Sequence, residues 1–265
     1  MARWLLDCEP LCGHPWRLGL ATTDAEREAV FRLRHDVFFR ECGYRDGGGP
    51  DGRDVDEFDE WCDQILVWDE RHERAVGTYR AIRGAEALKR GGLYADVEFD
   101  FAPLAPIAAD ILQGGRSCVA AEYRTGPAVQ YLTYGMELLL REYGSKYFLG
   151  AESFRVQSQD ELNVIHSYLW QHCRDPEWYV EPRPDSRVPL DLVPVTEADA
   201  KKLPSFVRAD LRAGFLAASP PAWDPDFGCY DVLMLGRRDR LGRGYQRFLD
   251  RIERAVPDRA GESQT

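Results

Sequence analysis

The chain lacks the features that mark membrane, secreted and nucleic-acid-binding proteins. No apolar run approaches the ~18 residues that a membrane span needs. The N-terminal stretch, in which Arg3 is followed closely by Asp7 and Glu9, does not read as a signal peptide. The formal net charge of −11 at pH 7 disfavours a general affinity for nucleic acid or for anionic membranes. We therefore expect a cytoplasmic protein that does not bind nucleic acid.

Metal-binding and disulfide patterns are also missing. The seven cysteines are scattered, and no two of them form a C-x-x-C pair. Cys8 and Cys12 stand too far from other ligand types to make a zinc site. The sequence therefore predicts reduced thiols and no bound metal.

At 265 residues, the chain has the length of one large domain with an appendage. Hydrophobic spacing and turn residues predict eight elements in the order β, α, β, β, β, α, β, α. Their expected ranges are 16–21, 22–43 with Asp24 as its N-cap, 64–70, 74–83, a strand from 111, 127–144, 146–154 and 160–173. Strands that alternate with helices predict an α/β protein with a mixed sheet covered on two faces.

The rest of the chain divides by composition. We expect a core over 16–175 and a proline-rich extension over 176–250 that packs on this core. Within the extension, helical periodicity returns at 203–218. The final residues, 251–265, are polar and are predicted to be a disordered tail.

The central stretch "ILQGGRSCVAAEYRTGPAVQYL" (111–132) reads as a strand, a loop and the start of a helix. Such a connection commonly binds phosphate, because helix N-termini present free N–H groups. This loop is poor in glycine, however, and Pro127 removes one N–H donor. The sequence therefore predicts a reduced phosphate site.

The element order, with this central strand, loop and helix, resembles the GNAT acyltransferase fold. In that superfamily the loop normally reads Q/R-x-x-G-x-G/A and holds the pyrophosphate of coenzyme A. Arg124 and Gly126 stand in the matching frame, but the second glycine is missing. The resemblance assigns Arg124 and Gly126 to phosphopantetheine binding.

Several further motifs carry a narrower resemblance. They are "FRLRHDVFFRECGY", "DVDEFDEWCDQILVWD", "VGTYRAI", "GGRSCVAAEYR", "LGAESF" and "PPAWDPDFGCYDVLML". Over about residues 25–250, their order resembles that of bacterial ornithine-lipid N-acyltransferases. Those enzymes are similar to acyl-homoserine-lactone synthases, which share the pattern of Arg34, Phe38, Asp56, Asp59 and Arg116.

The resemblance implies a reaction and its partners. An acyl group, 3-hydroxylated in the expected case, would pass from acyl carrier protein (ACP) to the α-amine of L-ornithine and give lyso-ornithine lipid. No resident cofactor is expected, because acyl-ACP is the donor substrate. That donor lacks the nucleotide pyrophosphate, which would account for the reduced loop. A peripheral contact with the inner membrane stays open.

Charged residues in the shared motifs have expected roles in this transfer. Arg80 or Arg116 can take the substrate carboxylate, and Asp56 or Asp59 can take an ammonium group. Backbone N–H groups along 117–119, from Ser117 to Val119, can stabilise the thioester oxygen as charge develops. A second interpretation remains equally open, in which Arg34, Arg116 and the aspartates only form a structural ion-pair network.

The general base is the point at which this sequence departs from the related families. They usually carry a glutamate three residues before the arginine of "GRSCV", and here that position is Gln113. Glutamine cannot accept a proton at neutral pH. Glu122 or Glu152 can serve instead, a water chain can carry the proton, or the protein is slow or has another acceptor. The alternative functions are an N-acyltransferase for a different amino acid or signalling amide, and a non-catalytic acyl-ACP-binding or lipid-binding relative.

Two segments near the C-terminus are candidate surfaces. The stretch 237–254 holds seven arginines against three acidic residues, and it includes Arg238 and Arg243. Because ACPs are strongly acidic, we expect ACP to dock there, although a solvated helix or contact with lipid head groups is not excluded. The second segment, 204–218, is predicted to be an amphipathic helix at a membrane surface, at the mouth of the acyl tunnel, or packed on the sheet.

Overall fold

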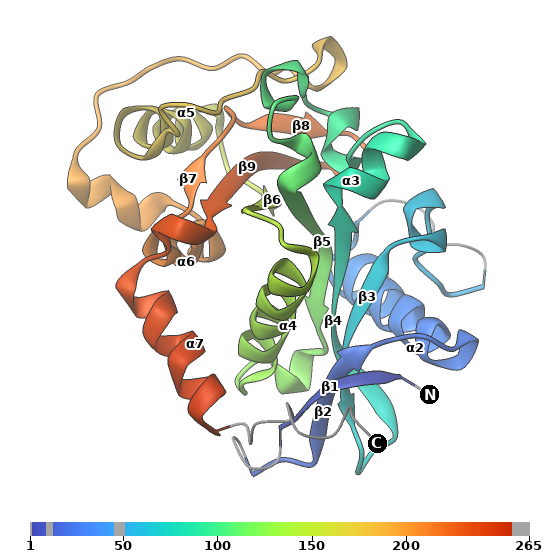
Figure 1. The fold of residues 1–265 in the computed structure, drawn as a ribbon. Coiled ribbons are helices and arrows are strands. Elements are labelled where there is room, and N and C mark those ends of the chain that lie inside the picture. Colours follow the sequence, from blue (N-terminus) through green and yellow to red (C-terminus); the bar gives the residue numbers. More distant parts are fainter. Residues whose placement is uncertain (1, 9–12, 45–50, 256–265) are drawn as a thin grey trace.

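A computed structural model describes residues 2–8, 13–44 and 51–255 of the chain. These residues form one mixed sheet with the strand order β1-β2-β3-β4-β5-β6-β9-β7, and β8 pairs with β9 (Figure 1). The strands are β1 (Arg3–Asp7), β2 (Trp16–Leu20), β3 (Asp63–Asp69), β4 (Arg74–Arg83), β5 (Ile111–Val119), β6 (Tyr147–Phe154), β7 (Leu216–Ala217), β8 (Ala222–Asp224) and β9 (Cys229–Arg237). The mixed sheet confirms the predicted α/β class.

Helices cover both faces of the sheet. They are α2 (Asp24–His35), α3 (Gly84–Ala87), α4 (Ala128–Tyr143), α5 (Gln159–Tyr168), α6 (Ser205–Ala213) and α7 (Arg243–Ala255). Alternating residues of β3 divide between the two layers, since Ile65 and Val67 pack in the core under α4, whereas Leu66 packs under α2. None of the helices in the described ranges is long and apolar enough to cross a membrane.

The start of α2 corrects one detail of the prediction. The N-cap is Thr23, whose side chain accepts a hydrogen bond from the N–H of Glu26, while the Glu26 side chain accepts one from the N–H of Thr23. This reciprocal pair satisfies two N–H groups that have no partner within the helix. Asp24, which we expected as the cap, is the first residue of the helix. At its other end, α2 continues into a π-helical turn over Asp36–Glu41.

The sheet opens between β5 and β6. These two strands are parallel and pair from Ile111–Tyr147 to Gly114–Gly150. Beyond Gly114, β5 continues in register with β4 alone, so it has no strand neighbour on its β6 side. The two strands therefore diverge into a fork, and backbone groups on its inner edges are left without sheet partners.

The C-terminal segment completes this sheet. β9 pairs along its whole length with β6, from Tyr147–Arg237 to Phe154–Tyr230. The 176–250 segment therefore supplies β7, β8 and β9 to the same sheet as 16–175, in addition to packing helices on it. Residues 251–255, which we expected in a disordered tail, belong to α7, and 256–265 lie outside the described residues.

Candidate active site

The fork closes on two glycines, Gly114 and Gly150, which face each other across the last β5–β6 pair. A Cβ atom added to Gly114 would lie 2.7 Å from the ring of Tyr79, and one added to Gly150 would lie 2.9 Å from Oε1 of Glu152. Both approaches are too close for a real side chain. The absence of a Cβ at both positions therefore lets the side chains of Tyr79 and Glu152 occupy the base of the fork.

A β-bulge lies next to this point. Thr78 pairs with Cys118 and Arg80 pairs with Gly115, so Arg116 and Ser117 together stand opposite the single residue Tyr79. Arg116 has a φ of 51°, in the left-handed region that non-glycine residues seldom adopt. Bulges of this kind redirect a side chain and leave backbone groups unpaired. Here the bulge directs Arg116 into the pocket beside the fork.

Three arginines and three aspartates hold the bulge in place. Arg34 is fully buried, and its Nη atoms donate to both carboxylate oxygens of Asp59 at 2.7 and 3.0 Å. The Nη1 atom of Arg80, also fully buried, lies 2.6 Å from Oδ1 of Asp56. Burial alone would raise the pKa of Asp59, but hydrogen bonds from Arg34 and the charges of Arg34 and Arg80 lower it to about 2.

Arg116 is the member of this network that reaches the pocket. Its Nη2 lies 3.2 Å from Oδ2 of Asp56, its Nε lies 3.2 Å from Oδ2 of Asp54, and its Nη1 donates to the hydroxyl of Tyr94 at 2.9 Å. Arg34 and Arg80 are absent from the pocket wall. The network therefore joins all three arginines by ion pairs, and of the three only Arg116 lies on the pocket wall.

The pocket beside the fork is charged and rimmed by aromatic rings. Its volume is about 310 Å³. The polar lining consists of Arg116, Ser117, Glu152, Ser153, Asp224 and Asp231. The aromatic lining consists of Phe38, Tyr44, Tyr79, Tyr94, Phe206 and Phe227. We call this cavity the acidic pocket, because its three carboxyl groups outnumber its one arginine.

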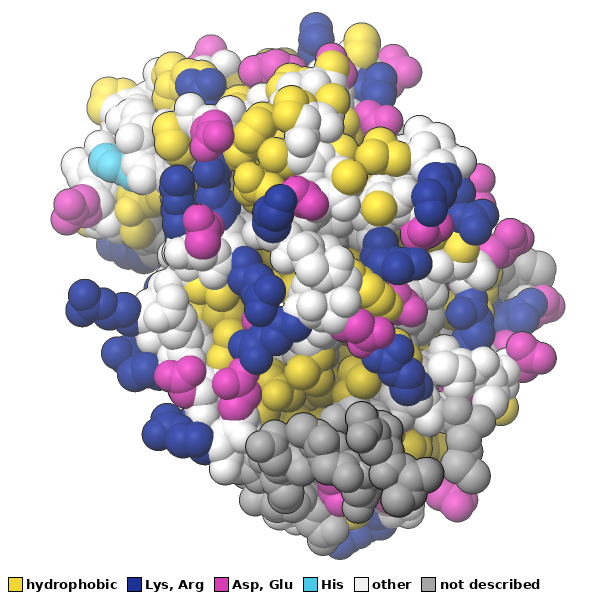
Figure 2. Space-filling model, in the orientation of Figure 1, with side chains coloured by type: hydrophobic (Ala, Val, Ile, Leu, Met, Phe, Trp, Pro, Cys, Tyr) yellow, Lys and Arg dark blue, Asp and Glu magenta, His cyan; other side chains and the backbone are white. Residues whose placement is uncertain are grey.

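A second cavity of about 290 Å³ lies between α4, α6 and α7. Its wall is mostly apolar and includes Met136, Leu140, Phe148, Phe215 and Phe248. On the face shown in Figure 2, hydrophobic side chains lie between α4 and α7, and Lys and Arg side chains stand along the α7 edge. We call this second space the apolar cavity.

The two cavities meet at Tyr79 and at a pair of carboxyl groups. Tyr79 lines both of them. Glu152 lines the acidic pocket, Asp210 lines the apolar cavity, and the two carboxyl groups hydrogen-bond each other. Burial raises the pKa of Asp210 to about 7, and burial together with the charge of Asp210 raises the pKa of Glu152 well above its usual value. Such a pair holds a proton at neutral pH and can exchange it with a ligand.

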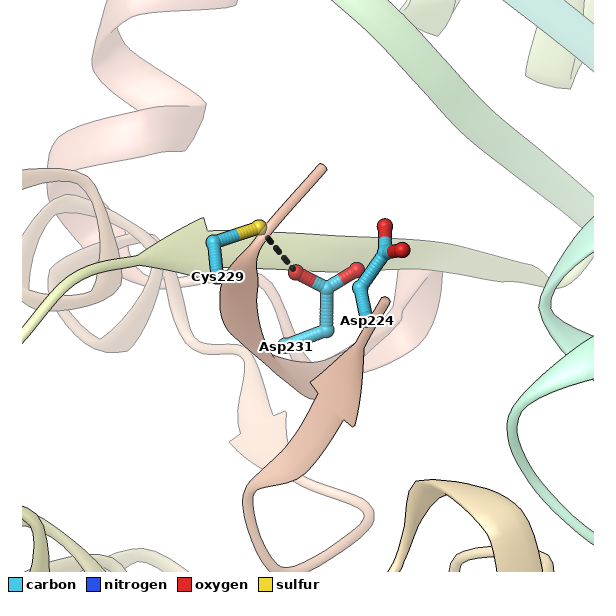
Figure 3. A group of neighbouring side chains, drawn as sticks. All are labelled: Asp224, Cys229 and Asp231. Atoms are coloured by element: carbon cyan, nitrogen blue, oxygen red, sulfur yellow. Dashed lines mark hydrogen bonds between the residues drawn. The ribbon is translucent and has the colours of Figure 1, made fainter. Parts of the chain in front are cut away.

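Two of the three carboxyl groups of the acidic pocket, Asp224 and Asp231, lie beside a thiol, and their charges act on a third buried carboxyl group, Glu98, outside the pocket wall. Oxygen atoms of Asp224 and Asp231 and the Sγ of Cys229 all lie within 4.8 Å of one another, and all three residues are buried (Figure 3). The Cys229 thiol donates to Oδ1 of Asp231 at 3.7 Å. Burial raises the pKa of Asp231 to about 6, and burial with the charges of Asp231, Asp224 and Asp226 raises that of Glu98 to about 9.

These three side chains are the metal-ligand group that the described residues offer. The chemistry of the donors does not suit a metal ion. Burial and the charge of Asp231 raise the pKa of the Cys229 thiol, so a metal ion would first have to displace its proton, because a metal ligand must be a thiolate. One oxygen of Asp224 already accepts from the N–H groups of Asp226 and Phe227 at 2.7 and 3.1 Å.

Other residues expected from sequence lie in different places. Ser117 is exposed at the pocket wall, whereas Val119 is buried in the core under α4. Glu122 is exposed on the outside of the protein, where it forms an ion pair with Arg74. Of the two carboxylates expected as substitutes for Gln113, Glu152 lines the pocket and Glu122 does not.

Gln113 is buried on β5, and neither side-chain polar atom has a hydrogen-bond partner in the described structure. It precedes the fork and does not line either cavity. Cys118 is buried in the core under α2. Burial raises the pKa of its thiol, which argues against a nucleophilic role.

The loop before α4 uses its N–H groups internally. The amides of Tyr123, Arg124 and Gly126 donate to carbonyls of Ala120, Ala121 and Tyr123 at 2.9, 3.4 and 3.1 Å. The guanidinium of Arg124 pairs with Glu41, and its Nε donates to the carbonyl of Val119 at 2.9 Å. These three loop amides are therefore not free to bind a pyrophosphate.

The basic C-terminal segment borders the apolar cavity. Arg238 lines it and lies 3.5 Å from Glu137, measured from Nε to Oε1. Arg243 begins α7 and is exposed, as is Arg247 one turn later. The helix packs through Leu249 and Ile252, which are buried in the core under α4. α7 is therefore a packed helix with an exposed basic face.

Sequence reasoning did not find Asp210, Asp224, Asp231 or Glu98. They come from four separate segments, and acidic residues normally indicate solvent-exposed positions. One signal was present: Asp231 stands in the apolar run "YDVLML", where a buried strand has no need of a charge. A carboxylate inside a fully buried strand is uncommon unless it serves a site.

Comparisons with known proteins identify relatives that cover most of the chain. Residues 33–134 match the acetyltransferase (GNAT) domain family. The chain is 32% identical over 242 residues to an L-ornithine Nα-acyltransferase of Brucella abortus, covering 85% of each protein. It is 31% identical over 230 residues to the protein of the same name from Rhizobium meliloti, covering 82% of this chain and 78% of the relative.

One solved structure shows the same fold at a TM-score of 0.50. The ternary complex of TofI with an inhibitor and MTA superposes with a TM-score of 0.50 at 14% identity, covering 89% of this chain and 96% of TofI. The CoA-dependent acyl-homoserine lactone synthase BjaI gives a TM-score of 0.49 at 19% identity, covering 85% of this chain and 81% of that one. With the relatives above, the chain belongs to the L-ornithine Nα-acyltransferase family and is an acyltransferase with a GNAT domain.

Proposed function

We propose that the protein transfers a 3-hydroxy fatty acyl group from acyl-ACP to the α-amine of L-ornithine and forms lyso-ornithine lipid. The observation that carries the proposal is the meeting of an apolar cavity and an acidic pocket at Tyr79 and the Glu152–Asp210 pair. The apolar cavity suits an acyl chain, and the acidic pocket suits a cationic amino acid. The names of the relatives support ornithine as the acceptor.

The reaction joins the α-nitrogen to the acyl carbon and breaks the bond between that carbon and the pantetheine sulfur. The amine must be neutral to attack, so its ammonium form must first lose a proton. In the proposed mechanism the Glu152–Asp210 pair takes this proton. The pKa of Asp210, raised by burial to about 7, puts one proton exchange of the pair near neutral pH, where a general base works best.

Two further requirements are met at the fork. Backbone N–H groups at the bulge, around Ser117, have no partner strand on the β6 side and can donate to the thioester oxygen as it becomes negative. The second proton of the nitrogen must reach the leaving sulfur. Tyr79 is fitted to relay it, because burial first, and then the charges of Glu152 and Asp210, raise the pKa of its hydroxyl and keep it protonated.

Arg116 would bind the carboxylate of the amino acid. It is the only arginine on the wall of the acidic pocket, among the described residues, and the aspartates behind it fix its orientation. A guanidinium in a fixed position can bind a carboxylate through two parallel hydrogen bonds. This would orient the α-amine relative to Glu152.

The proposed donor is acyl-ACP, and ACP would dock on the exposed basic face of α7, with Arg238 and Arg243 nearest the apolar cavity. The internally bonded amides of the loop before α4 support a donor without a pyrophosphate. The test is to give the purified protein 3-hydroxyacyl-ACP or 3-hydroxyacyl-CoA with L-ornithine and to identify products by mass spectrometry. Equal turnover with the two donors would contradict the proposed donor, and no acylated amino acid from either would contradict the reaction.

A further inference from the structure

Three buried carboxyl groups at or near the acidic pocket have no cationic partner among the described residues: Asp224 and Asp231 line the pocket, and Glu98 is a buried neighbour that does not line it. Glu98, Asp224 and Asp231 form no ion pair within 4.0 Å with any described Lys, Arg or His. The nearby arginine, Arg116, already lies between Asp54 and Asp56. Glu98 is only 5% exposed, and its Oε2 atom has no hydrogen-bond partner among the described residues. An unpartnered buried carboxyl oxygen is costly unless a ligand completes it.

The direction of the strands places these groups on the opposite side of the fork from the proposed base. Asp231 of β9 stands directly opposite Ser153 of β6, so their side chains share one face of the sheet. Glu152, the preceding residue, points to the other face, where it meets Asp210 at the apolar cavity. Both faces are reached from the acidic pocket, because the sheet is open there.

A substrate with two amino groups fits this division. Its α-amine would lie near Glu152 and Asp210, and its side chain would extend to the other face of the sheet. Aromatic rings of Tyr94 and Phe227 line the path between these positions and can contact the methylene groups. The chemistry at the far end calls for a cation that donates several hydrogen bonds. An ammonium group has three N–H donors, so it can hydrogen-bond several carboxyl oxygens at once. A metal ion would in addition have to displace the proton of the Cys229 thiol.

We propose that Asp224 and Asp231, with Glu98 as their buried neighbour, bind the side-chain ammonium of the acceptor and thereby select a diamino acid. This inference rests on the proposed function, which places an amino acid in the acidic pocket. It adds the residues that distinguish a diamino acid from a monoamino acid of the same length. In the free protein the raised pKa values keep part of this group protonated, so it can stay empty without three adjacent negative charges.

The experiment measures ligand binding by calorimetry in the absence of any acyl donor. The ligands are L-ornithine, L-norvaline, which has the same carbon chain without the side-chain amine, and 1,4-diaminobutane, which lacks the carboxylate. We expect wild-type protein to bind ornithine at least ~100-fold more tightly than norvaline, because norvaline has no ammonium group to hydrogen-bond these buried carboxyl groups. Asp231→Asn and Asp224→Asn should each weaken ornithine binding ~10- to 100-fold and leave norvaline binding nearly unchanged.

Two controls keep the result interpretable. Asp185→Asn removes an exposed carboxylate that lines neither cavity, on the short helix Pro184–Ser186, and should bind both amino acids as wild type does. Thermal melts report folding, and we expect Asp231→Asn and Glu98→Gln to melt at or above the wild-type temperature, because each removes a repelling buried carboxyl group.

Each outcome decides between the two proposals. Equal binding of ornithine and norvaline to wild type, or undiminished preference for ornithine in Asp231→Asn, would overturn the ammonium site. So would stabilisation by Mg²⁺ or Zn²⁺ that Asp231→Asn abolishes while ornithine fails to compete. Selective binding of ornithine without acylation by any donor would keep the ammonium site and reject the proposed function. Acylation of norvaline as fast as ornithine would keep an N-acyltransferase and reject the ammonium site.

Discussion

Glu152→Gln is the substitution that most directly tests the proton transfer. The amide has nearly the same shape as the carboxyl group and can still hydrogen-bond Asp210, but it cannot take a proton from the substrate. A correctly placed general base contributes roughly 10²- to 10⁴-fold to the rate. We therefore expect kcat to fall by about that factor, while the KM for acyl-ACP stays close to the wild-type value.

The same substitution should change how stability depends on pH. The pKa of Asp210 is raised from 3.8 to about 7 by burial, and that of Glu152 is raised further by burial and by Asp210. A carboxyl group with a raised pKa binds more protons in the folded state, so its stabilising effect is complete at low pH and is lost as pH rises through the folded pKa. For Asp210 alone this corresponds to up to ~4 kcal/mol between about pH 4 and pH 8.

The assay combines kinetics with thermal melts. Wild-type Tm should fall as pH rises from 5 to 9, and Glu152→Gln should flatten this fall, because one of the coupled carboxyl groups is gone. The wild-type rate should decline below about pH 7, as the pair takes up its second proton, and the variant should lose this inflection. A folded Glu152→Gln protein that keeps its rate within ~3-fold and retains the wild-type pH profile would refute the assignment of the base.

The remaining predictions concern the ion-pair network around Arg116, the buried Gln113 on β5, and the acyl donor. Arg116→Ala should abolish transfer and lower Tm, since breaking a buried charge pair costs ~3–5 kcal/mol. An active Arg116→Ala protein would contradict substrate binding by Arg116. Cys118→Ala, the control, should keep most activity. Gln113→Glu should lower Tm without raising kcat, because the new carboxyl group would be buried outside both cavities; a faster enzyme would instead reveal a proton route through β5. Arg243→Glu with Arg247→Glu should raise the KM for acyl-ACP several-fold and weaken its salt dependence, with the KM for ornithine unchanged; unchanged affinity for acyl-ACP at low salt would place the docking surface elsewhere.

The sequence predicted correctly those strands and helices whose bounds are marked by short-range signals. The hairpin of β3 and β4, the fork strand β5, and helix α4 between Pro127 and Gly144 all lie within a residue or two of their expected bounds. Each has a short-range signal, such as the turn at 70–73 or the glycine that ends α4 in a left-handed conformation.

The strands β1 and β9 were not predicted, and for β9 the reason is physical. β9 is buried on both faces, so its residues do not alternate between apolar and polar, and its pairing partner β6 lies about 80 residues earlier in the chain. Periodicity cannot reveal a strand of this kind when turn residues do not bound it clearly.

The candidate site divides in the same way. Arg34, Arg80, Arg116 and their aspartates were expected as a group, since the resemblance supplied them together, and the structure joins them by ion pairs. The carboxyl pair of Glu152 and Asp210 was only half expected. Asp210 lies on α6, and nothing local to that helix shows that its side chain would be buried against β6.

The glycine pair at the base of the fork has a consequence for how the product leaves. An N-acylated amino acid made at this point would have its hydrocarbon tail in the apolar cavity and its head group in the acidic pocket, on either side of Tyr79. Such a molecule would span the open part of the sheet. Its charged head group could follow the hydrocarbon tail only after losing its hydration water. We therefore expect an order of release. The free carrier protein would dissociate first, and the hydrocarbon tail would then leave the apolar cavity for another apolar environment. Under the proposed function, we therefore expect the product to leave faster when a lipid surface is present than in water alone.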